Sequence, residues 1–316
     1  MTKLKKTPKN KKVNYDLGEN IHDTVTRNHI TWFPGHMNKA IKQIKEKLRQ
    51  VDIVLELRDA RTPLATANHM AIDAIGEKCR LIVINKMNLA DPEIIKQWEI
   101  WFKDQGVPFL FTNCFDKVSR NKIVTLAKKI VHEKKMQSNP DGYSRKKFRM
   151  MIIGVPNTGK STIINQLAKR NASKAADKPG QTQTQLWVKV DDELEILDTP
   201  GVMPPKVATY EQGLWLAAIH AIPEKIVDAE RTALFIIDHF LKLKPAIFKT
   251  RYNLESFDIG FIEVLDQVGK LRGCFLKKGL YDYDRIYKII IIDFRTGELG
   301  PISLGIPPLK RVKKEK

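Results

Sequence analysis

The sequence predicts an α/β fold in which a mostly parallel β-sheet, covered by helices on both faces, is followed by a smaller, mainly α-helical domain. Three observations predict it. Short apolar segments alternate with helical segments between about residues 40 and 200, as in parallel sheets that are buried on both faces. A Gly-rich segment follows one of the apolar strands and precedes a helix. Beyond about residue 205, helical segments replace the strands.

The expected strands are short apolar runs. We expect them at residues 52–57, 80–84, 108–112 and 148–153, with a hairpin of two more at 186–190 and 194–197. Amphipathic segments between and after them predict helices at 40–50, 64–75, 122–133 and 161–170, and near 224–242, 253–269 and 282–293. One further helix should begin at Pro92, because Asp91 is a good N-cap and proline suits the first helical position.

The chain of 316 residues is long enough for two domains with their own hydrophobic cores. Its first thirteen positions are rich in lysine and contain no acidic residue, and basic residues return at the C-terminal end. Residues 1–30 are therefore expected to form a basic flexible tail, and residues 304–316 a second one. Between the tails, we expect the α/β domain at 31–205 and the helical domain at 206–303.

The formal net charge of +19 indicates a polyanionic partner, because neutralising phosphates releases counterions and drives binding. Nucleic acid is the first expectation, an anionic membrane surface the second, and a merely well-solvated basic surface the third. No apolar run approaches the roughly 18 residues of a membrane span, and the N-terminus lacks the apolar core of a secretory signal. Cys79, Cys114 and Cys274 match no metal-ligand spacing. We therefore expect free thiols in a cytoplasmic protein without stable membrane association.

The segment Gly154-Val155-Pro156-Asn157-Thr158-Gly159-Lys160-Ser161 follows one expected strand and opens a helix. This is the context that a phosphate-binding loop requires. Its glycines let backbone N–H groups approach a phosphate, and the helix N-terminus adds the positive end of a dipole. Lys160 is expected to reach the β- and γ-phosphates of a nucleoside triphosphate, and Ser161 to ligate Mg²⁺ through its hydroxyl. A plain Gly-rich turn is the alternative.

Asp198-Thr199-Pro200-Gly201 follows the apolar strand at 194–197. An aspartate at a strand end can hold Mg²⁺, directly or through water, and the Gly201 N–H can face a γ-phosphate. By itself this tetrapeptide is typical of a β-turn. Its spacing after the phosphate-binding loop favours a role in the same site.

Asn85-Lys86-Met87-Asn88 follows the strand at 80–84 and resembles the guanine-reading N-K-x-D motif of GTPases. The last residue differs. An aspartate there accepts hydrogen bonds from guanine N1–H and the exocyclic amine, whereas Asn88 offers one acceptor and one donor, a mismatch that costs roughly 1–3 kcal/mol. Xanthine would suit Asn88 better than guanine. Asn113 and Cys114, after the strand at 108–112, stand where GTPases place a loop against the base.

The order of these motifs is unusual, because the base-reading motif precedes the phosphate loop, whereas in small GTPases it follows. A circular permutation of the same sheet accounts for this order. The sequence resembles the circularly permuted ribosome-assembly GTPases and, among them, the ribosome biogenesis GTPase A (RbgA/YlqF) family. Besides the motifs above, the resemblance rests on four stretches between about residues 30 and 303: Trp32-Phe33-Pro34-Gly35-His36-Met37, Arg58-Asp59-Ala60-Arg61-Thr62-Pro63, Pro179-Gly180-Gln181-Thr182, and the stretch from Arg272-Gly273-Cys274 through Phe294-Arg295-Thr296-Gly297-Glu298-Leu299-Gly300.

The resemblance implies a circularly permuted P-loop GTPase domain, then a helical RNA-binding domain. It implies a slow GTP hydrolase, stimulated by the ribosomal particle, that assists late maturation of the large ribosomal subunit. Such a protein would bind the precursor and its rRNA with GTP and leave after hydrolysis, with a monomer expected away from the ribosome. The residues expected to bind GTP are Asn85, Lys86, Met87, Asn88, Asn113, Cys114, Asn157, Thr158, Gly159, Lys160, Ser161, Thr162 and Gly201.

Two metal-related roles also come from the resemblance. Thr182 is the implied switch threonine, which would join Ser161 and Asp198 at Mg²⁺ when GTP is bound; the alternative is a polar residue in a long loop. Asn157 matches the asparagine that holds K⁺ beside the phosphates in related GTPases, and the alternative is a turn-forming residue.

The catalytic residue is implied in the same way. Val202 stands where Ras-like enzymes keep a water-orienting glutamine, and a valine cannot polarise water. The resemblance assigns that task to His36, whose neutral imidazole can orient a water or accept its proton. The alternative is that His36 only packs against or caps the helix that begins nearby.

Two other groups have more than one interpretation. Arg58-Asp59-Ala60-Arg61 is either an internal Asp–Arg pair that holds a loop or a contact for a partner. Aromatic and basic residues near the C-terminus suit irregular rRNA, or else belong to a helical core with a solvated face; they are Phe275, Lys277, Lys278, Tyr281, Tyr283 and Arg285. For the whole chain, the alternative is an RNA-binding assembly factor whose nucleotide site is degenerate or altered in specificity by Asn88.

Overall fold

The computed structural model describes residues 36–138, 147–168, 186–190, 192–203, 207, 209–256 and 260–308. Within these residues, six strands form one sheet in the order β3-β2-β1-β4-β6-β5. β5 is antiparallel to β6, and the other neighbours are parallel. The strands are β1 (Ile53–Asp59), β2 (Cys79–Asn85), β3 (Phe109–Phe111), β4 (Phe148–Gly154), β5 (Leu186–Lys189) and β6 (Leu194–Asp198). The predicted mostly parallel sheet is confirmed.

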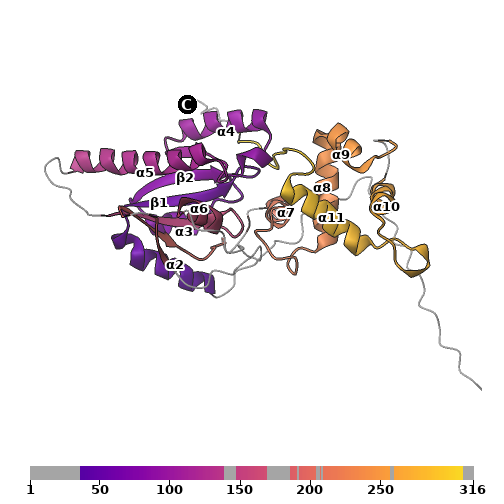
Figure 1. Ribbon diagram of the computed structural model, residues 1–316, viewed down its shortest axis with the longest axis horizontal. Coiled ribbons are helices and arrows are strands. Elements are labelled where there is room, and N and C mark those ends of the chain that lie inside the picture. Colours follow the sequence, from indigo (N-terminus) through magenta and orange to yellow (C-terminus); the bar gives the residue numbers. More distant parts are fainter. Residues whose placement is uncertain are drawn as a thin grey trace, which may run out of the picture.

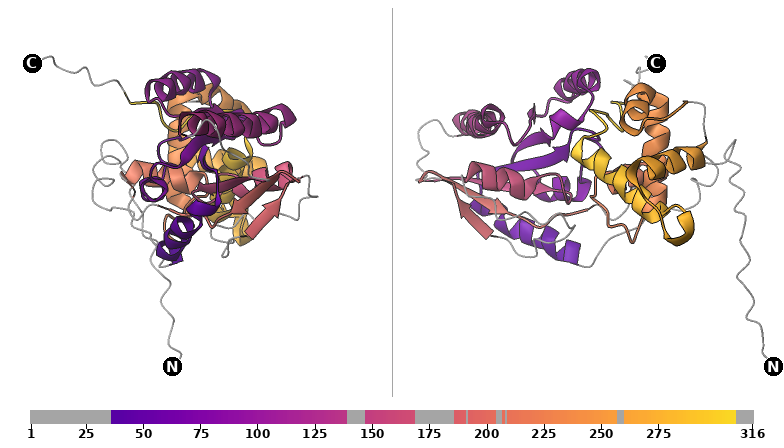
Figure 2. Two further views of the ribbon diagram at one scale, coloured as in Figure 1. Left: turned by 90° about the vertical axis from the view of Figure 1, so that its left-hand side faces the viewer. Right: turned by 45° about the vertical axis from the view of Figure 1, so that its right-hand side comes forward.

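Helices cover both faces of the sheet and make up the rest of the described chain (Figure 1). Those of the α/β part are α2 (His36–Lys47), α3 (His69–Ile75), α4 (Pro92–Asp104), α5 (Lys117–Ser138) and α6 (Lys160–Leu167). Those of the helical part are α7 (Tyr210–Ala218), α8 (Ala229–Leu243), α9 (Pro245–Tyr252), α10 (Phe261–Arg272) and α11 (Tyr283–Thr296). The two groups lie side by side in Figure 1 and in the right-hand view of Figure 2.

Local sequence signals placed some boundaries well and others poorly. α4 begins at Pro92 and its N-cap Asp91 accepts a hydrogen bond from the Glu93 amide, as predicted. α5 is longer at both ends than the predicted helix at 122–133. α7 and α9 were not predicted. Five of the nine residues of α7 are buried, so its sequence shows no polar face that would have revealed a helix.

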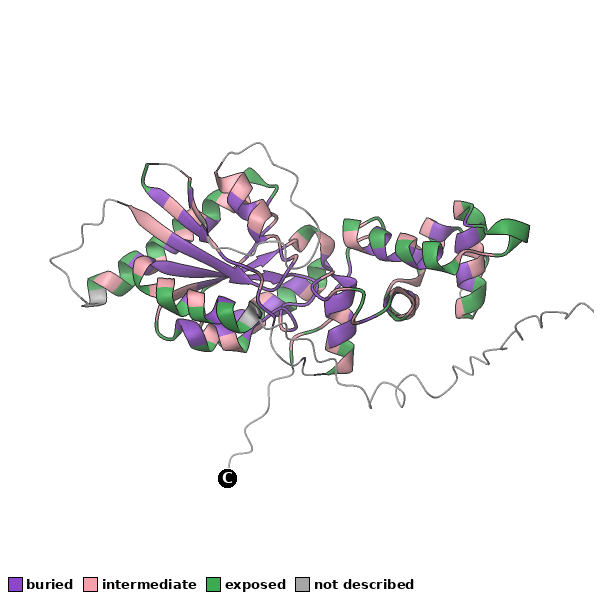
Figure 3. Cartoon of the chain, turned by 90° about the horizontal axis from the view of Figure 1, so that it is seen from below, coloured by how far each residue is buried: buried purple, intermediate pink, exposed green. Residues whose placement is uncertain are grey.

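The core is continuous from the sheet into the helical part. One face of the sheet packs on α5 and α6, through residues such as Ile123 and Ile163. Buried residues of the opposite face, including Val54 and Met151, share one hydrophobic cluster with α2, α3 and helices α7, α8, α10 and α11. Figure 3 shows buried residues along most of the sheet and on into the helical part. The two parts are therefore joined by buried apolar contacts.

The segment after α11 returns to the α/β part, and we call residues 300–305 the C-terminal strap (Figure 1). The Ile302 amide donates to the Leu89 carbonyl, and the Leu304 amide donates to the Arg61 carbonyl. Trp98 Nε1 donates to the Gly305 carbonyl at 3.1 Å. Leu304, which the expected boundaries place in the basic tail, is buried, so packing continues to at least Gly305. In the part of the chain described here, no helix is long and apolar enough to cross a bilayer.

Candidate functional site

Polar side chains gather where parallel strands β1, β2, β4 and β6 end. Because parallel strands place their carboxyl ends at one edge of the sheet, the residues that close these strands are neighbours. They are Asp59, Asn85, Gly154 and Asp198. The structure thus brings together the predicted phosphate loop, the predicted base loop and the predicted Mg²⁺ aspartate.

The phosphate loop turns sharply between β4 and α6. Asn157 adopts a left-handed conformation with φ of 60°, and Gly159 has φ of 101°. A Cβ atom on Gly159 would collide with the Asn85 amide, so a glycine is required there. The Thr158 hydroxyl donates to the Val155 carbonyl at 2.9 Å, which tightens the turn. Ser161 and Thr162 lie half-buried in the first turn of α6.

Lys160 is buried behind this loop. Its Nζ donates to the Gly154 carbonyl at 3.2 Å and to the Val155 carbonyl at 3.0 Å. Burial lowers the pKa of Lys160 to about 8, although the nearby Asp198 carboxylate opposes the shift. The ammonium group is therefore held by the loop's own carbonyls, and an incoming phosphate would give it the counter-charge that these carbonyls lack.

Asp198 lies at the end of β6, where a divalent cation is expected. Burial raises its pKa, while the Lys160 ammonium partly counteracts this effect. Among the described residues, Asp198 Oδ1 is buried and has no hydrogen-bond partner. A buried carboxylate oxygen without a donor is suited to a metal ion or to water bound to one.

The segment after Asp198 is fixed to the sheet and to the phosphate loop. The Thr199 hydroxyl donates to the Ile152 carbonyl at 2.6 Å, and the Val202 amide donates to the Gly154 carbonyl at 3.2 Å. A Cβ on Gly201 would lie 3.0 Å from the Pro156 ring. The Val202 side chain is buried in the core, so it neither polarises nor approaches a water at the phosphates.

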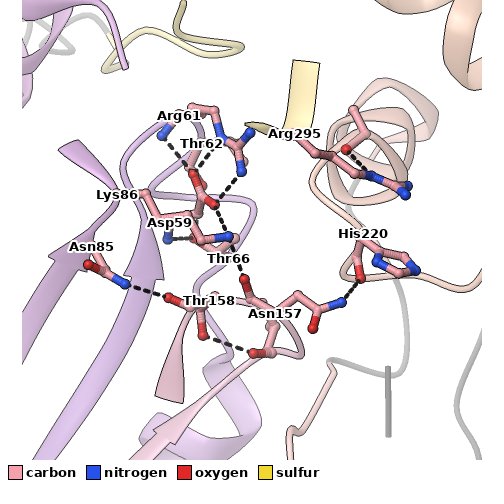
Figure 4. Close-up of polar contacts among 12 residues, drawn as sticks. Asp59, Arg61, Thr62, Thr66, Asn85, Lys86, Asn157, Thr158, His220 and Arg295 are labelled. Atoms are coloured by element: carbon pink, nitrogen blue, oxygen red, sulfur yellow. Dashed lines mark hydrogen bonds and ion pairs between the residues drawn. The ribbon is translucent and has the colours of Figure 1, made fainter. Parts of the chain in front are cut away.

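Asn85 joins the base loop to the phosphate loop. Its Nδ2 donates to the Thr158 carbonyl at 3.0 Å (Figure 4), and its Oδ1 accepts the Cys114 amide at 3.1 Å. The Asn113 carboxamide oxygen accepts the Phe115 amide and closes the turn after β3. Cys114 is buried, and burial raises the pKa of its thiol. In this structure, Asn85, Asn113 and Cys114 therefore take part in hydrogen bonds that fix the backbone of the loops after β2 and β3.

Lys86 is held by a buried ion pair. Its Nζ lies 3.2 Å from Asp59 Oδ2 and donates to the Asn157 carbonyl at 2.6 Å. Asp59 is fully buried and also receives the Arg61 guanidinium through Nε at 2.9 Å and Nη2 at 2.8 Å. Burial alone would raise the pKa of Asp59, but Arg61 and Lys86 outweigh it and hold that pKa well below its usual range. Of the two interpretations of this segment, the internal pair is confirmed.

Met87 and Asn88 continue the base loop as a short 3₁₀ turn, Met87–Leu89. The Met87 amide donates to the Thr112 carbonyl at 3.1 Å, and the Leu89 carbonyl is bound by the strap. The Asn88 side chain is exposed, so it is available to a base. The loop is braced on both sides of Asn88, which limits how far this residue can adjust.

Two predicted residues fall outside what the structure describes. Thr182 lies outside the described residues. His36 begins α2, but its side chain is not among those described. The catalytic role of His36 and the switch role of Thr182 therefore remain predictions.

A contact that the sequence did not predict joins the phosphate loop to the helical part. Asn157 Nδ2 donates to the backbone carbonyl of His220 at 2.7 Å. His220 follows α7 and has a left-handed backbone with φ of 66°. No sequence signal marks a backbone acceptor of this kind. The sequence does indicate that Asp59 and Lys86 lie close together. Asp59 ends β1, and Asn85, the residue before Lys86, ends the neighbouring strand β2.

Comparison with known proteins places these features in a family context. Residues 149–266 match a family model described as a 50S ribosome-binding GTPase. The Ribosome biogenesis GTPase A of Bacillus pumilus is 40% identical over 278 residues, which cover 88% of this chain and 99% of the relative. The protein of that name in Thermotoga maritima is 30% identical over 88% of this chain and 95% of its own length. Mitochondrial ribosome-associated GTPase 1 of Xenopus tropicalis is 30% identical over 92% of this chain and 96% of its own length.

Solved structures show the same likeness. A GDP-bound YlqF structure has a TM-score of 0.59 and 28% identity, and the match covers 84% of this chain and 99% of that one. The GNP-bound YlqF of T. maritima has a TM-score of 0.58 and 27% identity, with 85% and 98% covered. The likeness therefore extends over the α/β part and the helical part together.

Proposed function

We propose that the chain, which belongs to the ribosome biogenesis GTPase A family and is a GTP hydrolase, acts as an assembly factor in late maturation of the large ribosomal subunit. The observation that carries this proposal is that the phosphate loop and the base loop meet at one sheet edge. The phosphate loop is bonded to His220 of the helical part, and the base loop to Ile302 of the strap. GTP favours binding of the precursor particle and its rRNA, and hydrolysis favours release.

Mg²⁺ accompanies the nucleotide in GTPases and neutralises charge on its phosphates. Ser161 and Asp198 are the described residues that fit this ion, since Asp198 Oδ1 is a buried acceptor without a donor in the described structure. We assign Thr182 to the same ion in the GTP-bound state. We assign K⁺ to Asn157: only the oxygen of its amide can ligate a cation, and the bond to His220 uses the nitrogen.

The remaining nucleotide contacts follow from the two loops. Backbone N–H groups of residues 157–162 and of Gly201 are assigned to the phosphates, and Lys160 to the β- and γ-phosphates. Residues 85–88 are assigned to the base, with Asn113 and Cys114 beside it. The bonds of Asn85 to Thr158 and Cys114 support this assignment, because they hold the base side and the phosphate side at one separation.

We assign catalysis to His36. The burial of Val202 supports this, because the residue that orients water in Ras-like enzymes has no counterpart at that place. His36→Ala should lower single-turnover GTP hydrolysis on large-subunit particles about a hundred-fold and leave GTP affinity within about two-fold. A large loss of affinity with preserved turnover would contradict the catalytic role.

The helical part presents a surface suited to single-stranded or irregular RNA. Four aromatic rings follow one another there, with centroid separations of 5.2 Å for Phe275–Tyr281, 6.3 Å for Tyr281–Tyr283 and 6.3 Å for Tyr283–Tyr287. Phe275 is 47% exposed. Exposed cations accompany these rings at Lys277, Lys278 and Arg285. Unpaired bases stack on such rings while the cations meet phosphates.

Cosedimentation with precursor large-subunit particles tests the proposal. The protein should pellet with the particles in a non-hydrolysable GTP analogue and stay in the supernatant with GDP. Equal association in both states would overturn the switch. The double variant Lys277→Gln/Lys278→Gln should weaken association, whereas the matched change Lys128→Gln/Lys129→Gln on exposed α5 should not. Equal losses for both double variants would show that net charge alone, and not the aromatic surface, drives binding.

We place the protein in the cytoplasm as a monomer when it is away from the ribosome. The higher identity to the Bacillus pumilus relative, 40%, than to the mitochondrial relative of Xenopus tropicalis, 30%, supports this location. Sedimentation velocity of the purified protein tests the monomer.

A further inference from the structure

The C-terminal end of α11 lies against the end of α7. Arg295 Nε donates to the Ala218 carbonyl at 3.0 Å, and its Nη2 donates to the Ala217 carbonyl at 3.0 Å. Helices leave their last carbonyls without intrahelical partners, and Arg295 caps the end of α7 from another helix. The Ala217 carbonyl also accepts the His220 amide at 2.9 Å. Glu224 pairs with the same guanidinium at 3.7 Å.

The turn that Arg295 holds is also the turn that contacts the phosphate loop. His220 lies two residues after Ala218, and its carbonyl accepts the side-chain amide of Asn157 at 2.7 Å (Figure 4). His220 has a left-handed backbone, with φ of 66°, at the turn that follows α7. A displacement of the end of α7 would therefore displace the His220 carbonyl, which accepts the hydrogen bond from the Asn157 side chain.

The residue before Arg295 reaches the base loop by a second route. The Arg61 guanidinium lies over the Phe294 ring, 4.9 Å from its centroid. Arg61 holds Asp59, and Asp59 holds Lys86. Lys86 in turn donates to the Asn157 carbonyl. The contacts form a closed ring that begins and ends at the end of α11 and passes through both nucleotide loops.

We propose that Arg295 is a positioning residue of the nucleotide site, which couples occupancy of that site to the placement of the helical part. α11 reaches the Asn157 side chain of the phosphate loop through Arg295 and the turn at His220. It reaches the Lys86 side chain of the base loop through Arg61 and Asp59. A nucleotide that orders either loop therefore favours the capped end of α7, and by linkage the capped end favours the nucleotide. This inference rests on GTP binding by the chain and adds a regulatory path to it.

Nucleotide affinity of two matched variants tests the coupling in the full-length protein with Mg²⁺. Arg295→Gln removes the cap, and we expect GDP affinity by isothermal titration calorimetry to fall about three- to ten-fold. Arg251→Gln is the control: Arg251 pairs with Asp293 of α11 and with Glu298 just after that helix, and its ion pairs within the described structure involve neither nucleotide loop. The control should stay within about two-fold. Equal effects of both variants, or no effect of either, would overturn the proposal.

Hydrogen exchange separates coupling from mere stabilisation. In the wild type, GDP should slow amide exchange of residues 217–222 as well as of the phosphate loop. In Arg295→Gln, GDP should still protect the phosphate loop and no longer residues 217–222, and Arg295→Lys should restore part of the effect. If GDP leaves exchange at 217–222 unchanged in the wild type, the coupling is absent, whether or not the variant folds. Neither measurement uses a ribosomal particle, so failure of the assembly role would leave this result intact.

Discussion

Two buried arginine–carboxylate pairs lie next to each other in the chain, and they differ in what surrounds them. Arg58 pairs with Glu56 at 2.7 Å, and Arg61 pairs with Asp59 at 2.8 Å. All four side chains are at most 5% exposed. Both pairs join an arginine to a carboxylate two positions earlier, at nearly the same distance and with the same near-complete burial.

Their further partners set them apart. Arg58 lies over Phe102 of α4, so its pair is enclosed within the α/β part. Arg61 lies over Phe294 of α11, and its carboxylate partner also holds the base-loop Lys86. The first pair therefore bears on stability alone. The second pair bears on stability and on the nucleotide site. What each buried pair does therefore depends on the residues that it contacts besides its own two members.

The largest expected effect comes from removing one carboxylate charge from each pair. Glu56→Gln and Asp59→Asn each leave buried cations without a counter-charge, which should lower the free energy of unfolding by about 3–5 kcal/mol. Urea denaturation measures this loss. At a temperature where both variants are folded, only Asp59→Asn should weaken GDP binding. Equal GDP affinity in the two variants would remove the distinction between the pairs.

A change at the exposed end of the base loop should have the next largest effect. Because Lys86 and the strap hold the loop, Asn88→Asp should place a carboxylate where guanine presents two donors and tighten GTP binding about ten-fold. Competition among GTP, ITP and XTP measures this effect. A wild-type preference for XTP over GTP would show that Asn88 already selects another base.

Shortening the aromatic rings under the two arginines is a milder change. Phe102→Leu and Phe294→Leu should each cost about 1–2 kcal/mol of stability, from lost contact area and the lost cation–π contact. Thermal and urea unfolding should rank them alike. Only Phe294→Leu should weaken GDP binding, by about two- to three-fold. If Phe102→Leu weakens GDP binding as much, packing in general, and not the α11 contact, supports the loop.

The smallest effect concerns a third buried cation, Lys160, which has carbonyl partners in place of a paired carboxylate. Its pKa is lowered to about 8 in the nucleotide-free protein, and bound phosphates should raise it. Binding then takes up a proton above pH 8, so GTP affinity should be level below about pH 8 and fall above it, by less than ten-fold per pH unit. Calorimetry in buffers of different ionisation enthalpy measures the proton uptake. Proton release at pH 8.5 would contradict the sign.

The sequence revealed those features whose cause is local. The strand, Gly-rich loop and helix order of β4, residues 154–161 and α6 depends on residues close in sequence, as does the Asp91–Pro92 helix start, and both local structures are confirmed. α7 was missed because its residues are apolar on nearly every side, a pattern that only tertiary packing explains. The Asn157–His220 bond spans 63 positions and ends on a backbone atom, so no residue type could have predicted it.

The C-terminal strap has a consequence for the order in which the molecule is completed. The Asp91 amide donates to the Ser303 hydroxyl, a residue 212 positions later, and the Leu89 carbonyl is bound by Ile302. Contacts between residues so far apart form late, because the intervening chain must first be ordered. During synthesis, the base loop emerges early and stays without this support until the strap has been made. A nascent chain therefore lacks the bonds that brace its base loop until the strap has been translated.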